Sequence, residues 1–456
     1  MNTYQELLDS QRSFFNTNAT KSVKFRKEQM KKLLHILKTH EKELDEAIYA
    51  DFKKSAFENF ATELSLIYSE LKHSIKMVNH WSKKKYAGTN LANLPGSSYI
   101  IPEPLGNTLV IGAWNYPYLL SLHPAISAMA AGNTIVLKPS ELAMNTSNLM
   151  AKLINENFDS QYFHVVEGGV KETTELLQQK FDKIFYTGSS PVGKIIMRAA
   201  SEHLTPVVLE LGGKSPAIVT KGASIKMAAK RLVWGKFLNG GQTCVAPDYL
   251  MVDKSVKQQL IEEIKKQITK IHGDYPQKSE AFVRIINPRH FDRITQLMDQ
   301  DKIIVGGQTD KQDLYIAPTL MDHVNWDDAV MKEEIFGPVL PIIEYEDLND
   351  AIAQIKAQEK PLALYLFTNK KSIRDQVFHE ISFGGGALNE TIMHLANPNL
   401  PFGGVGNSGT GSYHGEYGFA AFSHQKSIIQ KPNWFEPFVK YAPYTSFKLS
   451  VLKKLM

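Results

Sequence analysis

The N-terminal part of the chain carries apolar side chains at the spacing of amphipathic helices. Between residues 21 and 50 the apolar positions recur every three or four residues, at Met30, Leu33, Leu34, Leu37, Leu44 and Ile48, opposite a face of Lys and Glu. This spacing predicts one long helix over 21–50 and a second helical stretch near 57–82. The segment 87–104 is rich in turn-forming residues and predicts an extended excursion from the first domain.

Beyond residue 105 the pattern changes to short apolar runs that alternate with helical stretches. The runs that predict strands are Thr108–Ala113, Thr134–Leu137, Tyr162–Val166, Lys183–Tyr186 and Pro206–Leu211. Helical periodicity lies between them, near 118–131, 143–157, 171–180 and 191–203. This alternation predicts a parallel sheet covered on both faces, which binds ligands at the carboxyl ends of its strands. A similar but less clear alternation from 214 to about 400 predicts a second α/β domain.

Composition and charge are those of a globular protein and exclude several classes of function. Hydrophobic residues make up 43% of the 456 residues and charged residues 22%, with a net charge of +5. That charge is too small over this length to imply a nucleic-acid partner. We find no signal peptide in the first 25 residues and no apolar run that approaches the ~18 to 20 residues of a membrane span, so we expect a cytoplasmic protein.

The single cysteine, Cys244, is the most informative residue of the chain. It excludes an internal disulfide and a multi-cysteine zinc site, and it suits a reducing compartment. Paired glycines and polar residues precede it, which predicts a tight loop whose backbone N–H groups point at the sulfur and favour the nucleophilic thiolate. The alternative is an inert residue of the core.

Two glycine-rich or charged segments follow predicted strands and are candidates for a nucleotide site. Gly188 and Gly193 lie between a strand and a helix, where backbone can approach a phosphate, although a plain turn is the alternative. Lys138 and Glu141 end another strand and could both reach the hydroxyls of a ribose. The alternative there is a helix N-cap at Ser140 with Glu141 in the first turn.

Three further positions could carry chemistry. The amide of Asn115 could stabilise an oxyanion, or it could form an Asx turn ahead of a proline. Glu210 ends an apolar strand, where a carboxylate either caps a loop or acts as a base whose pKa is tuned by burial. Glu334 and Phe336 could bind a sugar and stack on a flat ring, or they could form a surface turn.

Taken together and in order, these motifs resemble the aldehyde dehydrogenase superfamily. The resemblance rests on Trp-Asn-Tyr-Pro, Lys-Pro-Ser-Glu, the Thr-Gly-Ser…Gly turn, Glu-Leu-Gly-Gly-Lys-Ser-Pro, Gly-Gln-Thr-Cys, Glu-Glu-Ile-Phe-Gly-Pro and Pro-Phe-Gly-Gly-Val-Gly. It runs from about residue 20 to about 430. Three features are similar to the class 3 branch, which includes fatty and aromatic aldehyde dehydrogenases. They are the motif Tyr-Thr-Gly-Ser, the stretch from Gly409 to Gly415 and the long C-terminal arm.

The resemblance implies oxidation of an aldehyde to a carboxylic acid through a cysteine thiohemiacetal and a thioester. Cys244 would be the nucleophile, Asn115 with the Cys244 N–H the oxyanion site, and Glu210 the base that activates water. The implied contacts to NAD, with NADP as an alternative, are Trp114, Lys138, Ser140, Glu141, Gly188, Ser189, Gly193, Leu211, Glu334 and Phe336. No metal is implied, and we expect Tyr116 and Tyr68 in the substrate pocket.

The implied fold is α/β, with a Rossmann-type cofactor domain, an α/β catalytic domain and a small β extension for oligomerisation. We expect the NAD(P)-binding domain over 1–86 and 105–211, the catalytic domain over 212–400, the extension over 87–104 and 401–430, and a C-terminal arm over 431–456. The arm is aromatic and basic but too short to span a membrane. Packing on a partner subunit of a homodimer is favoured for it over contact with a membrane surface.

Two other functions stay open at this stage. A coenzyme A-acylating aldehyde dehydrogenase would pass the thioester to a thiol, but a water-activating Glu210 favours hydrolysis. A protein that kept the fold and lost the chemistry is disfavoured because Cys244, Glu210 and Asn115 are all intact.

Overall fold

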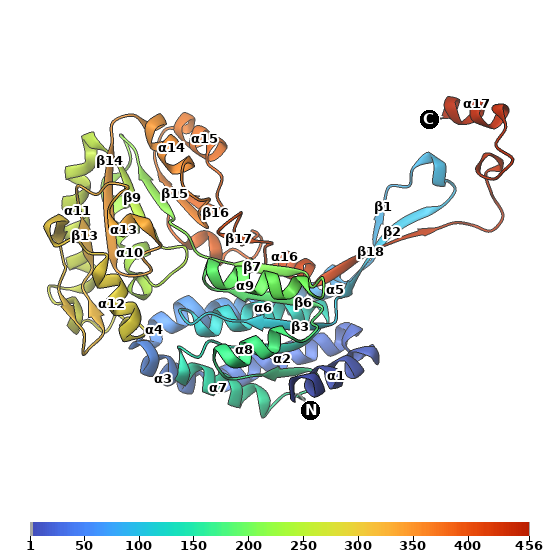
Figure 1. The fold of residues 1–456 in the computed structure, drawn as a ribbon, viewed down its shortest axis with the longest axis horizontal. Helices are drawn as coiled ribbons and strands as arrows, with labels where there is room; N and C mark the ends of the chain where they lie inside the picture. The colour runs from blue at the N-terminus through green and yellow to red at the C-terminus, as the bar shows by residue number, and fades with distance from the viewer. Residues whose placement is uncertain (1–2, 456) are drawn as a thin grey trace.

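The computed structural model describes residues 3–455, which form two sheet-centred lobes and a projecting arm (Figure 1). The sheet of the first lobe has the order β17-β7-β6-β3-β4-β5, and only β17 runs antiparallel to its neighbour. Its strands are β3 Asn107–Ile111, β4 Thr134–Lys138, β5 Phe163–Val165, β6 Lys183–Thr187, β7 Val207–Glu210 and β17 Gly409–Thr410. The five predicted strands and their parallel pairing are therefore confirmed.

The helices between these strands are also confirmed: α6 Pro117–Ala131, α7 Met144–Asn155, α8 Val170–Leu177 and α9 Ser190–Ser201. Helix α6 is buried along its whole length of 15 residues. Its ends follow the usual chemistry, because Pro117 occupies the first turn and Gly132 ends the helix in a left-handed conformation with φ 96°. The segment that leads into α6 is consequently held rigidly.

The helical N-terminus differs from prediction in one respect. It consists of α1 Thr3–Asn16, α2 Val23–Thr39, α3 Glu41–Phe52, α4 Ala56–Asn59, a π-helical segment Phe60–Leu64 and α5 Ser65–Trp81. The single helix predicted over 21–50 is wrong, because His40 leaves the helical region with ψ 20° and separates α2 from α3. The apolar stripe continues across the break, since Met30 and Leu44 pack into the same core. Periodicity alone could not reveal the bend.

The second lobe contains a seven-stranded sheet of order β10-β13-β14-β9-β8-β15-β16, parallel except for β10. Its strands are β8 Pro216–Val219, β9 Tyr249–Asp253, β10 Ile303–Val305, β13 Thr319–Met321, β14 Val339–Tyr345, β15 Ala363–Phe367 and β16 Gly385–Leu388. Its helices are α10 Ile225–Phe237, α11 Lys254–His272, α12 Pro288–Gln296, α13 Ala329–Lys332, α14 Leu348–Lys356 and α15 Lys371–Glu380, and β11 Thr309–Asp310 pairs with β12 Tyr315–Ile316. The predicted second α/β unit is confirmed.

The arm is an antiparallel sheet of β1 Lys85–Ala87, β2 Ser97–Pro104 and β18 Ser423–Gln430, and helix α17 Ser446–Leu455 lies beyond it (Figure 1). Part of the segment 401–430 lies on the first lobe instead, since β17 pairs with β7 and helix α16 Gly415–Ala421 contacts α6. The domain boundaries stay a prediction. Among residues 3–455, no helix combines the length and the apolar character needed to cross a membrane.

Candidate active site

Four parallel strands of the first lobe bring their carboxyl ends to one edge of the sheet. In register, Ile111 at the end of β3 pairs with Lys138 at the end of β4, and Thr187 at the end of β6 pairs with Glu210 at the end of β7. Parallel sheets of this kind bind ligands outside these ends. The strand ends that the sequence singled out therefore share one edge.

The segment before Cys244 forms the predicted tight loop. Asn239, Gly240 and Gly241 all adopt positive φ values, of 52°, 60° and 74°. Glycine is required at 241, because a Cβ there would lie 2.2 Å from the carbonyl oxygen of Gly337. The loop ends with Cys244 partly exposed.

The segment that carries Asn115 is tied to this loop by side-chain hydrogen bonds. The Nδ2 of Asn115 donates to the carbonyl oxygen of Gln242 at 3.0 Å, and Tyr116 Oη lies 2.6 Å from Thr243 Oγ1. A primary amide has two N–H groups, so Asn115 keeps one for another acceptor. The structure thus brings Asn115 next to the Cys244 loop.

Glu210 is a buried carboxyl that has no hydrogen-bond partner for either oxygen within the described part of the chain. Burial raises its pKa well above the usual value for a glutamate. A buried polar group without a partner is rare in proteins and marks a functional position. The sequence hypothesis of a base tuned by burial agrees with this environment.

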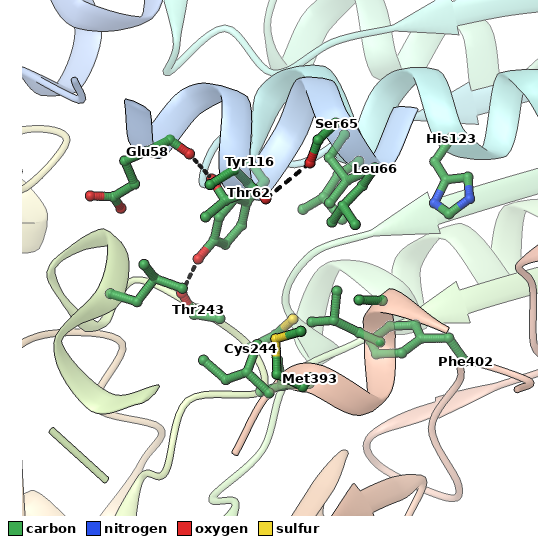
Figure 2. Close-up of a pocket in the computed structure, with 18 of the residues that line it drawn as sticks. Glu58, Thr62, Ser65, Leu66, Tyr116, His123, Thr243, Cys244, Met393 and Phe402 are labelled. Carbon is green, nitrogen blue, oxygen red and sulfur yellow. Dashed lines mark hydrogen bonds between the residues drawn. The ribbon is translucent and has the colours of Figure 1, made fainter. Parts of the chain in front are cut away.

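Cys244 and Glu210 line one cavity of about 530 Å³. Figure 2 shows Cys244 between Tyr116 and Thr243 on one side and Phe402 on the other. Most of the wall is apolar and includes Leu66, Leu119, Leu120, Trp234, Phe237, Leu238, Val245, Ile271, Ile392, Met393 and Leu395. Its size is typical of a site for a small-molecule substrate.

One of the two tyrosines expected in the pocket is absent from its wall. Tyr116 lines the cavity, but the hydroxyl of Tyr68 donates to the carbonyl oxygen of Leu37 and to Glu41. The prediction for Tyr68 was wrong because its ring packs in the core between helices α2 and α5.

The electrostatics around the thiol also differ from prediction. Burial raises the pKa of Cys244 to about 12, and the nearby Glu334 and Glu210 carboxylates add to the rise. Backbone N–H groups of Cys244 and Val245 act in the opposite direction, as expected from the loop, but they are outweighed. The prediction that the loop holds the sulfur as a thiolate was therefore wrong for the protein alone.

Lys138 and Glu141 lie together at the end of β4. Lys138 Nζ donates to Glu141 Oε2 and to the carbonyl oxygen of Pro139, both at 2.9 Å. Ser140 does not cap a helix, since its Oγ accepts from the N–H of Leu142 and α7 begins only at Met144. The N-cap alternative for Ser140 is wrong, while the pairing of Lys138 with Glu141 suits two neighbouring hydroxyls of a sugar.

The turn between β6 and α9 is tightly packed around its glycines. A Cβ at Gly188 would lie 2.1 Å from Tyr186 Oη, and a Cβ at Gly193 would lie 2.9 Å from Leu211. Ser189 is the N-cap residue that precedes α9, and within residues 3–455 its side chain makes no capping hydrogen bond. The N-terminus of α9 is therefore open to an anion, and Gly193 lets α9 approach the end of β7.

Glu334 and Phe336, from the second lobe, lie against Gly212 and Trp114, which follow strands β7 and β3 of the first lobe. A Cβ at Gly212 would lie 2.0 Å from Glu334 Oε2, so a side chain there would displace that carboxyl. Burial, with a contribution from Asp248, raises the pKa of Glu334 to about 8. Phe336 has φ 50°, and its ring lies 5.3 Å from that of Trp114 in an edge-to-face contact.

These residues fit a dinucleotide cofactor. The glycine-containing turn after β6 leads into the N-terminus of α9, and a Lys–Glu pair lies at the end of β4 on the same edge of the sheet. With a cysteine and an unpartnered carboxyl in the adjoining cavity, the fold and the site define a dinucleotide-dependent oxidoreductase.

The comparisons with known proteins agree with this class. Residues 2–428 match the aldehyde dehydrogenase family, and the chain belongs to that family. It is therefore an enzyme that oxidises aldehydes, and the family uses NAD or NADP.

Two relatives and one solved structure give the degree of similarity. The chain is 48% identical over 446 residues to the 4,4'-diaponeurosporen-aldehyde dehydrogenase of Staphylococcus aureus, with 97% of each chain covered. It is 44% identical over 455 residues to aldehyde dehydrogenase family 3 member H1 of Arabidopsis thaliana, covering 99% of this chain and 94% of that one. A substrate-bound structure of Staphylococcus aureus AldH superposes with a TM-score of 0.98 at 47% identity, covering 100% of this chain and 99% of the other. The class 3 resemblance is confirmed.

Sequence reasoning missed one residue of the site. Thr187 belongs to the Thr-Gly-Ser strand end that the sequence singled out; it lines the cavity, and its hydroxyl has no hydrogen-bond partner among the described residues. Glu58 also lines the cavity, and its carboxyl accepts from the N–H of Asn239. No signal marked Glu58, because a glutamate in a helical stretch normally belongs to a solvated face.

Proposed function

We propose that this enzyme oxidises an apolar aldehyde to its carboxylic acid through a covalent intermediate on Cys244. One observation carries the proposal: Cys244 and the unpartnered carboxyl of Glu210 line the same mainly apolar cavity. A nucleophile and a base in one water-poor space are the requirements of acyl transfer followed by hydrolysis.

The first step is attack of the Cys244 sulfur on the aldehyde carbon. Because burial raises the pKa of the thiol to about 12, the proton must leave as the carbon–sulfur bond forms. Cys244 is partly exposed, so water in the cavity can take up this proton. The carbonyl oxygen becomes the oxyanion of a thiohemiacetal.

The free N–H of the Asn115 amide and the backbone N–H of Cys244 stabilise this oxyanion. Their segments are held together by the bond from Asn115 to Gln242. Removal of one such donor costs ~3 kcal/mol of barrier.

The thiohemiacetal then loses a hydride and becomes a thioester. Bound NAD(P) supplies the hydride acceptor. Lys138 and Glu141 would hold its adenosine ribose, Gly188 and Ser189 its phosphates, and Glu334 with Phe336 its nicotinamide end. Trp114, Ser140, Gly193 and Leu211 would shape the walls around these contacts.

Glu210 acts in the last step. Its carboxylate removes a proton from water, and the hydroxide adds to the thioester carbon. The carbon–sulfur bond then breaks to leave the acid, and the departing Cys244 thiolate takes the proton back from Glu210. A carboxylate that activates water supports hydrolysis over transfer to coenzyme A, so we do not favour the acylating alternative.

We propose NAD as the preferred cofactor and NADP as an accepted one. The Glu141 carboxylate, next to Lys138, repels a 2′-phosphate at its position. Its side chain is 45% exposed, which leaves it room to turn toward solvent when that phosphate binds.

We propose a substrate with an extended hydrocarbon chain. The apolar wall of the cavity and the substrate in the name of the Staphylococcus aureus relative support this class.

We also propose a cytoplasmic homodimer in which the arm over 431–456 packs on the partner. Several aromatic side chains of the arm are exposed in the single chain, among them Trp434, Tyr444 and Phe447. Light scattering of the full chain and of a chain ending at residue 430 tests this. The full chain should be a dimer and the shortened one should dissociate more readily. A co-sedimentation assay with vesicles should show equal partitioning of both.

A panel of aldehydes of increasing chain length, assayed with NAD and with NADP, tests the proposed reaction. We expect reduced cofactor and acid in equal amounts, a preference for long apolar chains, and no acid from Cys244→Ala although that variant still binds cofactor. Turnover by Cys244→Ala, or acyl-coenzyme A as the main product when coenzyme A is present, would contradict the proposal.

A further inference from the structure

A buried cluster of charged side chains lies between α3 and α5, beside the cavity, and has no part in the mechanism described so far. Lys54 and Glu63 are fully buried, with 2.8 Å between Nζ and Oε1, and Glu58 is only 8% exposed. Burial raises the pKa of Glu58, although Lys54 opposes the rise. Buried charges are costly in free energy, so a cluster of three requires an explanation.

Glu63 is hydrogen-bonded to the helix that follows Asn115. Its second oxygen accepts hydrogen bonds from the backbone N–H groups of Tyr118 and Leu119, at 2.9 and 3.1 Å. These N–H groups belong to the first turn of α6, where they have no partner within the helix and where a negative charge is stabilising. Glu63 thus fixes the first turn of α6, which starts two residues after Asn115.

Glu58 is hydrogen-bonded to the loop that precedes Cys244. Its Oε1 accepts from the backbone N–H of Asn239 at 2.8 Å. Asn239 is held in a left-handed conformation, and its side-chain amide donates to the carbonyl oxygens of Asn115 at 2.8 Å and Gln242 at 3.2 Å. Glu58 therefore fixes the residue that bridges the Asn115 segment and the Cys244 loop.

Lys54 joins the two carboxylates. Its Nζ bonds to Glu63, lowers the pKa of Glu58, and lies 4.3 Å from the centre of the Tyr116 ring. Figure 2 shows Glu58 on the helical segment along one wall and Tyr116 reaching from that wall to Thr243, the neighbour of Cys244.

We propose that Glu58 is a positioning residue for the oxyanion site, supported by Lys54 and Glu63. This inference rests on the proposed function, in which Asn115 and the Cys244 N–H stabilise the oxyanion. Glu58 acts through Asn239, by fixing how far the Asn115 amide lies from the Cys244 backbone.

The effect of losing this contact follows from the geometry that such donors require. Donors at an oxyanion act over 2.7–3.1 Å, and a displacement of about 1 Å can lower the rate by ~100-fold. Without an acceptor for its N–H, the strained Asn239 turn is free to relax, and both of its bonds to the neighbouring carbonyls weaken.

The experiment compares Glu58→Ala with Glu58→Gln in the full-length enzyme. Because the glutamine oxygen can accept the same N–H, we expect Glu58→Gln to keep kcat within ~3-fold. Glu58→Ala should lower kcat by ~10- to 100-fold, with the KM for aldehyde and for NAD little changed. Alkylation of Cys244 by iodoacetamide should stay close to the unmodified rate, because it needs the sulfur but no oxyanion site.

Asp182→Ala is the matched control. Its carboxyl also accepts a backbone N–H, that of Asn107 at 2.8 Å, but at the opposite edge of the sheet. It should lower thermal stability without lowering kcat of the folded enzyme. A second variant, Asn239→Gly, keeps the N–H and the left-handed turn but removes the bridging amide. It should lose kcat to the same extent as Glu58→Ala.

The inference is overturned if Glu58→Ala keeps the unmodified kcat, if Glu58→Gln falls as far as Glu58→Ala, or if Asn239→Gly has full kcat. This last result decides the matter even where Glu58→Ala does not fold. Failure of the proposed function has a different signature, since Cys244→Ala would then retain activity whatever the Glu58 variants do.

Discussion

The side-chain amide of Asn115 and the backbone carbonyl of Gln242 lie 3.0 Å apart although 127 residues separate them in sequence. This bond joins the end of β3 in the first lobe to the loop that carries Cys244. It orients the amide with one N–H on the protein and the other free, which is the arrangement that an oxyanion donor needs.

We predict that Asn115→Ala lowers kcat by about 100- to 1,000-fold while leaving cofactor binding close to normal, because it removes one oxyanion donor. Steady-state kinetics and a titration with NADH separate the two effects. Asn155→Ala is a suitable control, since it also removes a hydrogen-bonded amide of the first lobe. An equal loss of kcat in both variants would show that Asn115 has only a structural role.

The raised pKa of Cys244 predicts slow alkylation of the protein without cofactor. The thiolate fraction grows as pH rises toward about 12, so the rate with iodoacetamide should increase ~10-fold per pH unit from pH 7 to 10. Glu334→Gln and Glu210→Gln each remove a carboxylate that raises this pKa, and both should react faster at a given pH. The exposed Glu202→Gln should react like the unmodified protein. A rate that is already fast and level at pH 7 contradicts the prediction.

Gly212 is predicted to be essential for the position of Glu334. A Cβ at 212 would lie 2.0 Å from Glu334 Oε2, so Gly212→Ala should displace the carboxyl and raise the KM for NAD by ~10-fold. Gly88→Ala, whose Cβ meets nothing within 4 Å, should leave the KM for NAD unchanged. In a Glu334→Ala background the Gly212 substitution should add little, and a fully additive effect would argue against the contact.

Glu141 is predicted to set the choice of cofactor. Glu141→Gln removes the charge that repels a 2′-phosphate, so kcat/KM with NADP should rise by about three- to tenfold and that with NAD should fall. Glu156→Gln, an exposed carboxylate just beyond α7, should change neither. If the ratio of kcat/KM with NADP to kcat/KM with NAD is unchanged in Glu141→Gln, then Glu141 does not set the choice of cofactor.

Much of the fold was predictable because the apolar runs of the first lobe are buried parallel strands with helices between them. The predicted runs end at Leu137 and Leu211, each within one residue of the observed ends of β4 at Lys138 and of β7 at Glu210. The break at His40 was not predictable, because the apolar stripe passes through it without a change of period.

The identity of the catalytic residues was predictable from the sequence, but their pKa values and supporting contacts were not. The motifs named Cys244, Glu210 and Asn115, but the high pKa of the thiol depends on its burial in the folded chain and on carboxylates distant in sequence. The attachment of Glu58 to Asn239 joins residues 181 positions apart, and no local pattern encodes such a contact. Tyr68 was misplaced for the same reason, since its hydroxyl bonds to Leu37 of α2 and Glu41 of α3.

The most direct test of the central claim, a covalent intermediate on Cys244 that Glu210 resolves, is acid quenching of Glu210→Gln with aldehyde and NAD, followed by mass spectrometry of the digested protein. The account predicts a burst of close to one reduced cofactor per subunit, slow turnover afterwards, and the acyl mass on the peptide that contains Cys244. Steady turnover at the unmodified rate, with no acyl group on that peptide, would contradict it.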